Sequence, residues 1–460
     1  MAFSIDHTHS RSMGPAPGKA VSVVRRILSC PRTTLFERLL LIIPIVTMPL
    51  NGISVKFGGE IIFFEIAGFS LLYILFGIQG IYLLLIRPGA LVKTWHHPVF
   101  LMAYILLILG TAVEFSHPHA SLGILVSLGS MFAGAVFIAS LCRDRGALQA
   151  CLYGLLIAGM WVSVYLFFLS YSGLNEATAT NFEEAVELRA EIFRHRNMPL
   201  KANANFLSFF SAQGAVVALA LALKVASARR RNLFLGVALF CFIASFLGLS
   251  RGAVTMAIIS CAFVMLSSGI QKFARFSKMI VVATVLVVGV LMWVPDAVFS
   301  RMVFVQTDEE GVKIARHKTY SAALEHLPEY LITGVGAGNF WGPWGVQSQY
   351  GGYIRGQPRV GGAHNGLIQV TLYWGLVGLI GVIAIIYQAY RSLPSRSIDD
   401  PLVLCLYGLS ITLLLYMQVH NVITAKQFAV GLGLLVGARR WVWPQSSVRR
   451  TQPIQIRRGS

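Results

Sequence analysis

The chain has 460 residues and a formal net charge of +19, yet only 12% of its residues are charged and 56% are hydrophobic. Soluble domains carry about 25% charged residues, so the composition excludes an ordinary soluble protein and predicts many membrane crossings. The positive charge could indicate nucleic-acid binding, but it is concentrated in short segments between apolar runs, a distribution typical of membrane topology.

The two ends of the chain are polar and basic. Residues 1–34 lack the short apolar core and the small-residue cleavage site of a secretory signal, so we expect a retained cytoplasmic tail. Residues 441–460 form a second basic segment, which we also expect in the cytoplasm.

Apolar runs that can cross a bilayer core need roughly 20 residues, fewer where flanking side chains reach the interface. The predicted spans are residues 35–53, 61–86, 98–113, 121–141, 150–170, 205–225, 233–250, 252–270, 279–294, 366–389, 401–418 and 427–440. The sequence therefore predicts an all-α polytopic membrane protein with about twelve transmembrane helices in one domain, residues 35–440.

Orientation follows from the distribution of Lys and Arg, which are more frequent in cytoplasmic segments. With both termini in the cytoplasm, most of the basic residues lie inside, in short segments such as 224–231. Two long loops then face the periplasm. One is residues 171–204, which has partial helical periodicity, and the other is residues 295–363, between spans 9 and 10.

Three ionisable residues stand out on the predicted outer side. Arg251 lies where two apolar runs meet with almost no loop, a costly position for a charge unless it reaches the interface or a partner. Arg316 lies in the long loop, four residues before Tyr320, on a helix predicted from Val312 to Leu327 and ended near Pro328. His364 closes the loop and is followed by Asn365.

These residue types suit a phosphate-linked substrate. Arginine donates paired hydrogen bonds to phosphate and stays charged, while histidine can accept a proton near neutral pH. Each also has a simpler interpretation: an anchoring arginine, a solvated surface helix and an interfacial histidine. The glycines from Gly334 to Gly338 are not a nucleotide-binding fingerprint and could form only a tight turn. Gly375 and Gly378 are expected to allow close helix packing.

The sequence predicts no metal site and no cofactor. No Asp-x-Asp pair occurs in the predicted outer segments, and the adjacent pair Asp399-Asp400 falls on the cytoplasmic side. No ATP-binding motif is present. Chemistry at the outer face would then use an activated donor, with arginines stabilising the developing charge.

Several of these motifs together resemble the bacterial O-antigen ligase/polymerase superfamily. The most specific is His364-Asn365, followed by nine residues and Gly375-x-x-Gly378. The supporting motifs are Ser250-Arg251-Gly252, Arg316 with Tyr320, Gly334-x-Gly336-x-Gly338-Asn339-Phe340, and Asn203-Ala204-Asn205 preceded by Arg194 and Arg196. Ala204 stands where the family has proline.

The resemblance implies transfer of a glycan from undecaprenyl pyrophosphate at the periplasmic face of the bacterial inner membrane. His364 would activate the acceptor hydroxyl, and Arg316 and Arg251 would bind the pyrophosphate as it leaves. The substrate-binding residues implied are Asn365, Arg194, Arg196, Tyr320 and Asn205. Metal and ATP are not required in this family, and attack opposite the leaving group would invert the anomeric centre.

The leading hypothesis is an O-antigen ligase, whose acceptor is the lipid A–core oligosaccharide. A polymerase of O-antigen or exopolysaccharide, whose acceptor is another carrier-linked glycan, shares the same residues and remains an alternative. A protein oligosaccharyltransferase of the superfamily is disfavoured because no large soluble C-terminal domain follows. A transporter of the lipid-linked glycan would be expected to show internal repeats, and none is evident.

Overall fold

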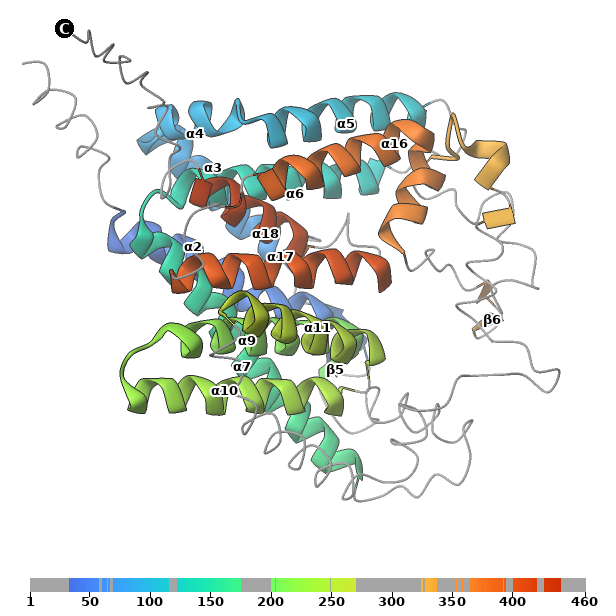
Figure 1. Cartoon of the computed structure of the whole chain (residues 1–460). Helices are drawn as coiled ribbons and strands as arrows, with labels where there is room; N and C mark the ends of the chain where they lie inside the picture. Colours follow the sequence, from blue (N-terminus) through green and yellow to red (C-terminus); the bar gives the residue numbers. More distant parts are fainter. Residues whose placement is uncertain are drawn as a thin grey trace, which may run out of the picture.

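A computed structural model covers the whole chain and describes most of residues 33–439 (Figure 1). The residues outside this description are 1–32, 58–59, 64, 67–68, 116–121, 175–199, 203, 249, 270–323, 326, 337–352, 355–356, 359–364, 392, 394–399, 420–425 and 440–460. Nearly all of both predicted tails and most of the two predicted periplasmic loops therefore lie outside the described residues, as does the predicted span 279–294.

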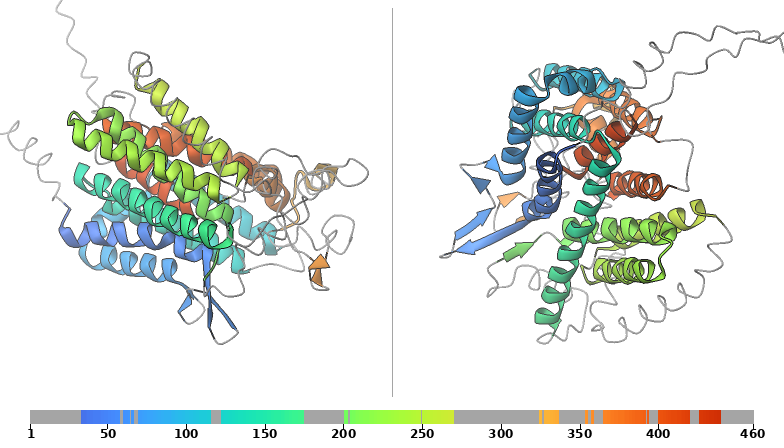
Figure 2. Two further views of the ribbon diagram at one scale, coloured as in Figure 1. Left: turned by 90° about the horizontal axis from the view of Figure 1, so that it is seen from below. Right: turned by 90° about the vertical axis from the view of Figure 1, so that its left-hand side faces the viewer.

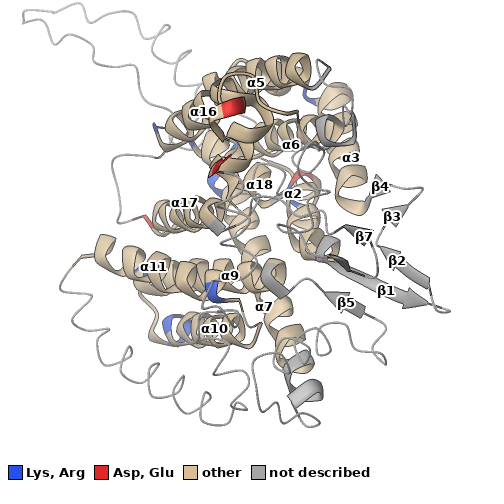
Figure 3. Cartoon of the chain, turned by 90° about the vertical axis from the view of Figure 1, so that its right-hand side faces the viewer, with Lys and Arg blue, Asp and Glu red and all other residues tan. Residues whose placement is uncertain are grey.

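The described chain is mainly helical. Its helices are α2 (Leu35–Thr47), α3 (Leu71–Ile86), α4 (Pro88–Trp95), α5 (Pro98–Phe115), α6 (Leu122–Leu141), α7 (Arg145–Leu174), α9 (Ala204–Lys224), α10 (Ala228–Leu247), α11 (Arg251–Ser267), α16 (Gly366–Arg391), α17 (Pro401–Val419) and α18 (Lys426–Gly437). The long helices run side by side (Figure 2), and few of their residues are charged (Figure 3).

Helix α9 is the buried centre of one part of the bundle. It packs against α7, α10, α11 and α17, and its residues from Leu207 to Leu223 are nearly all buried. Small residues allow its closest contact: a Cβ atom built on Gly159 of α7 would lie 2.6 Å from the Cα of Gly214 in α9. Close approach of backbones at small residues is the usual way in which membrane helices pack.

The second part of the bundle contains α3, α5, α6, α16 and α18. Helix α18 packs on α6, and α16 packs on α5, while α2 lies between α7 and α3. Helices α3 and α4 meet at a 112° bend, which Pro88 explains because proline cannot continue a helix through its own N–H but fits the first turn of a new one.

Short strands correct the predicted span at 61–86. Strand β1 (Ile53–Phe57) pairs antiparallel with β2 (Glu60–Phe63) and with β5 (Leu200–Ala202), and β3 (Glu65–Ile66) pairs with β4 (Phe69–Ser70). The helix therefore begins only at Leu71. The segment before it is rich in Phe and Ile, which favour strands, and carries Glu60 and Glu65, which disfavour a membrane interior.

Two further strands are described in the predicted long loop, β6 (Tyr353–Ile354) and β7 (Gln357–Pro358), which pair antiparallel.

Apart from 279–294, which lies outside the described residues, each predicted span overlaps a helix. Within the described residues, five helices are long and apolar enough to cross a membrane by themselves, or six if the bent pair α3 and α4 counts as one span. The chain is thus a helical membrane protein, and the count of twelve spans stays a prediction.

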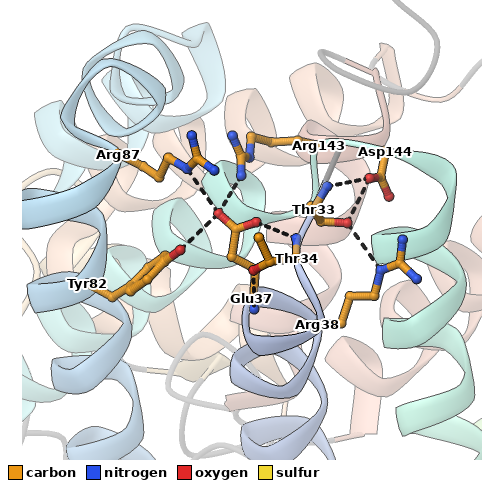
Figure 4. A network of polar contacts seen from close by, with 8 residues as sticks. All are labelled: Thr33, Thr34, Glu37, Arg38, Tyr82, Arg87, Arg143 and Asp144. Carbon is orange, nitrogen blue, oxygen red and sulfur yellow. Dashed lines mark hydrogen bonds and ion pairs between the residues drawn. The ribbon is translucent and has the colours of Figure 1, made fainter. Parts of the chain in front are cut away.

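A buried carboxylate joins three segments at one end of the bundle (Figure 4). Glu37 lies in the first turn of α2 and is fully buried. It forms ion pairs with Arg87, at 3.2 Å, and with Arg143, and its Oε1 accepts a hydrogen bond from the hydroxyl of Tyr82. Its other oxygen accepts from the backbone N–H of Thr34, which completes a capping box. We call these five residues the Glu37 network.

Asp144 forms a second contact beside the Glu37 network. Its carboxylate accepts hydrogen bonds from the backbone and side chain of Thr33, both at 2.7 Å. Burial raises the pKa of Asp144, but bonds from Thr33 and Ala147 and the charge of Arg38 outweigh it, so the pKa lies below its ordinary value. The ionised carboxylate therefore stabilises the fold at pH values above the ordinary carboxyl pKa. This stabilisation is lost as the pH falls through the lowered pKa of the folded state.

The register of α7 against α9 shows where this end lies. Gly159 contacts Gly214, and the hydroxyl of Ser163 lies 2.5 Å from that of Ser211, so the two helices are antiparallel. The start of α7, next to the Glu37 network, is therefore level with the end of α9. The same end carries the basic start of α10, Arg229 to Arg231.

We predict that Glu37→Gln strongly destabilises the fold. The amide would leave the guanidinium of Arg143, which is almost fully buried, without its carboxylate, a loss that typically costs about 3–5 kcal/mol. Thermal unfolding in detergent would show a lowered midpoint. Arg145→Ala is the matched control, because the Arg145 side chain, paired with Asp400, is 55% exposed, and an ion pair open to solvent should contribute less than about 1 kcal/mol. Equal midpoints for the two variants would contradict the prediction.

Candidate active site

Asn365 caps the start of α16. Its Oδ1 accepts hydrogen bonds from the backbone N–H groups of Leu367, at 3.0 Å, and Ile368, at 3.1 Å. Its Nδ2 lies 3.3 Å from Oε1 and 3.4 Å from the backbone oxygen of Gln418, near the end of α17. The start of α16 and the end of α17 therefore meet, and we call this part of the bundle the Asn365 end.

Arg251 lies at the same end. Helices α11 and α17 are antiparallel, because Thr412 donates a 3.0 Å hydrogen bond to Ser260 and Gly408 lies against Val264. Continued along both helices, this register brings the start of α11 level with the end of α17. Arg251 is the first residue of α11 and its side chain is exposed.

The Ser-Arg-Gly motif is thus a helix start. The side chain of Ser250 accepts a hydrogen bond from the backbone N–H of Ala253, as an N-cap residue does. Cations are disfavoured at a helix N-terminus, whereas anions are favoured there. A guanidinium beside the N–H groups of a first turn is an arrangement that suits a phosphate group.

The start of α9 lies at the Asn365 end as well. The ring of Phe209 stacks on that of Tyr416 with centroids 3.8 Å apart, and the backbone oxygen of Val217 lies 3.8 Å from the sulfur of Cys405. Helix α9 therefore runs antiparallel to α17. Asn205 is the second residue of α9, one helical turn before Phe209.

The structure thus brings three helix starts together around the end of α17: those of α9, α11 and α16. They carry Asn205, Arg251 and Asn365, which are 160 residues apart along the chain at most. The remaining predicted site residues lie outside the described residues: His364, Arg316, Tyr320, Arg194 and Arg196. His364 directly precedes Asn365 in the chain.

Helix α16 is broken, a feature that the glycine spacing alone did not predict. Trp374 and Gly375 have non-helical backbone angles, and Gly375 has a φ of 62°, a conformation that only glycine adopts at no steric cost. Gly375 therefore acts through its backbone conformation rather than by the helix packing that we expected. Trp374 is buried against α5, where a Cβ atom built on Gly110 would lie 2.7 Å from its indole ring.

Residues 331–336 form backbone hydrogen bonds with α16 at its break. The N–H of Val335 donates to the oxygen of Leu372 at 2.7 Å, and that of Gly336 to Tyr373 at 2.9 Å. In the reverse direction, the N–H of Leu376 donates to Leu331 at 2.6 Å. A helix break leaves N–H and C=O groups without partners, and these bonds replace them. We call this contact the α16 junction.

Close backbone contact explains why glycine is needed at two positions, Gly334 and Gly375, which belong to different sequence motifs. A Cβ atom on Gly334, which has a φ of 69°, would lie 2.3 Å from the oxygen of Tyr373. A Cβ atom on Gly375 would lie 2.2 Å from the oxygen of Ile332. The two glycine-containing motifs, separate in the sequence, are therefore the two sides of one contact. The sequence alone allowed Gly334 to be read as part of a tight turn, and in the structure Gly334 contacts the backbone of α16.

Apolar packing adds to the α16 junction. Val335 and Leu372 are buried together, with Leu327, Tyr330 and Ile368 packed around them. The three backbone bonds contribute about 0.5–1.5 kcal/mol each by typical values. The chain immediately before the junction, residues 327–330, is helical, and this helix ends two residues after Pro328, close to the predicted end. Most of the helix predicted from Val312 to Leu327 lies outside the described residues.

Within the described part of the chain, no group of three or more His, Cys, Asp or Glu residues could hold a metal ion. The groups that the described Asn365 end offers to a ligand are a guanidinium, an amide and helix N-termini. They suit an anionic or polyhydroxylated molecule.

These features define a multi-pass helical membrane protein with a polar, anion-compatible site at one end of its bundle. Residues 236–383 match the family model described as O-antigen ligase. The match confirms the resemblance to the O-antigen ligase/polymerase superfamily, whose members are glycosyltransferase-type enzymes acting on lipid-linked glycans. It runs from within α10 to within α16, and no curated protein matches the chain.

The matched segment contains most of the predicted site. It includes Arg251, Arg316, Tyr320, His364 and Asn365, together with both sides of the α16 junction. Arg194, Arg196 and Asn205 lie outside it.

We predict that Asn365→Ala lowers the stability of the protein, because losing an N-cap side chain typically costs about 0.5–2 kcal/mol. Asn365→Asp should retain the contribution of the cap, since its carboxylate can still accept the two N–H bonds and an anion is favourable at a helix start, and should lose only the contact of Nδ2 with Gln418. Thermal unfolding midpoints of the two variants in detergent provide the measurement. An alanine variant as stable as the native protein would show that the cap contributes nothing.

Proposed function

We propose that the protein is an O-antigen ligase: a metal-independent inverting glycosyltransferase that moves a glycan from undecaprenyl pyrophosphate to a lipid A–core acceptor. The observation that supports this most directly is the convergence of Arg251 and Asn365 at one end of the bundle, within the segment that matches the family. His364 directly precedes Asn365 in the sequence and lies within the same matched segment.

In the proposed reaction, His364 accepts the proton of an acceptor hydroxyl. The oxygen attacks the anomeric carbon of the donor as the bond to the pyrophosphate oxygen breaks. Undecaprenyl pyrophosphate leaves with the bonding electron pair, and Arg316 and Arg251 stabilise its charge through hydrogen bonds. Attack from the side opposite the leaving group inverts the anomeric centre. Asn365, Asn205, Tyr320, Arg194 and Arg196 would bind the sugar and phosphate groups.

We further propose that the Asn365 end faces the periplasm in a twelve-span topology with both termini in the cytoplasm. The distribution of charge supports this orientation. The opposite end carries Arg87, Arg143 and the run from Arg229 to Arg231, and basic residues favour the cytoplasmic side. The periplasmic side of the inner membrane holds no ATP, which fits a donor that is activated by its own pyrophosphate.

His364→Ala should lower the rate of glycan transfer by about 100- to 10,000-fold, the usual contribution of a general base. The measurement is transfer by purified enzyme from a carrier-linked glycan to lipid A–core oligosaccharide. His96→Ala is the matched control, because His96 is an exposed histidine at the end of α4. Near-native transfer by a correctly inserted His364→Ala protein would rule out the general-base role.

An acceptor exchange distinguishes the ligase from related functions. With lipid A–core present, we expect transfer to that acceptor and no elongation of a second carrier-linked glycan. Elongation of the carrier-linked glycan instead would identify a polymerase. Movement of the glycan lipid across vesicle membranes without transfer to either acceptor would identify a transporter.

A further inference from the structure

The first part of α16 is short and is held at both of its ends. It runs from Gly366 to Tyr373, about two helical turns. At its start, Asn365 is bonded to Gln418 of α17. At its other end, the oxygens of Leu372 and Tyr373 are bonded to the α16 junction. Because Gly375 breaks the helix, the direction of these two turns is set by the two contacts rather than by the rest of α16.

The α16 junction connects two segments that the proposed reaction needs to align. One is the start of α16, where His364 precedes Asn365. The other is the chain that enters the junction through residues 327–330 and that carries Arg316 eleven residues before Leu327. Backbone hydrogen bonds run in both directions between the two segments, so neither can move along the other without breaking them.

We propose that the α16 junction fixes the position of residues 331–336 relative to the start of α16 for catalysis, and that Gly334 and Gly375 are positioning residues of the enzyme. This inference rests on the proposed function. The glycines contact no substrate in it. They act by allowing two backbones to approach so closely that any side chain would separate them.

The test uses Gly334→Ala and Gly375→Ala, which disturb the junction from its two sides. A misplacement of catalytic groups by about 1 Å can lower turnover by about 100-fold, so kcat should fall by about that factor. The KM for the acceptor should change much less than kcat. A loss of folded protein alone would lower the yield and leave kcat per folded molecule unchanged, and that result in both variants would overturn the proposal.

Gly269→Ala is the matched control. Gly269 also has a positive φ, of 109°, but no atom lies within 4 Å of a Cβ built on it. It follows α11 at the end opposite Arg251. This variant also places a side chain at a positive φ, without disturbing the junction, so its kcat should remain native. A fall in kcat equal to that of Gly375→Ala would show that strain, and not positioning, is responsible.

A disulfide across the junction provides an independent measurement. Val335 and Leu372 share a backbone bond and a buried cluster, so cysteines there should meet the Cα separation of about 4.4–6.8 Å that a disulfide requires. The oxidised Val335→Cys/Leu372→Cys protein should turn over with the same kcat as its reduced form, because the bond only locks a contact that the proposal already holds closed. Loss of activity on oxidation, recovered by reduction, would show that the junction must open, which overturns the proposal.

Binding of undecaprenyl pyrophosphate separates this inference from the proposed function. If the native protein binds this lipid but transfers glycan to no acceptor, the proposed function fails. The junction is then judged by binding: both alanine variants should raise the Kd about tenfold or more, as expected when a charged contact is misplaced. Unchanged Kd values would overturn the inference.

Discussion

A membrane-spanning backbone cannot be interrupted unless the freed N–H and C=O groups find new partners, and this constraint decides the structure around the candidate site. In α16, the interruption at Gly375 is compensated by residues 331–336, which supply two backbone N–H donors and one backbone oxygen acceptor. These residues of the predicted long loop are therefore tied to the bundle through their backbone. The short helical segment that follows Asn365 gains a fixed direction as a result.

The charged side chains at the two ends of the bundle differ in their burial and in their contacts. At one end, the carboxylate of Glu37 is buried and balanced by Arg87 and Arg143, so its charges serve to hold α2, α3 and the start of α7 together. At the Asn365 end, Arg251 is exposed at a helix start. Its exposure makes it accessible to an anion that reaches the surface of the bundle. The same residue type is thus structural at one end and suited to binding at the other.

The sequence predicted much of this organisation and missed specific parts of it. Apolar runs identify helices because crossing a bilayer needs a certain length, and α9, α16 and α17 closely match their predicted ranges. The segment before Leu71 was assigned to a helix wrongly. Its strands pair with near neighbours, β2 with β1 and β3 with β4, and β1 also pairs with the distant Leu200–Ala202, which no local pattern reveals. The family motifs pointed to Arg251 and Asn365, but not to the roles of Ser250 and Asn365 as helix caps.

By itself, the sequence determined the class of protein, the resemblance to a family and the identity of the motif residues, because composition, hydrophobic run length and motif spacing are local properties. Only the tertiary structure decided that Arg251 and Asn365 share one end of the bundle. That result follows from the packing register of α11 on α17. Only the tertiary structure joined Gly334 to Gly375, because a contact between two backbones depends on shape and hydrogen-bond geometry across 41 residues of chain.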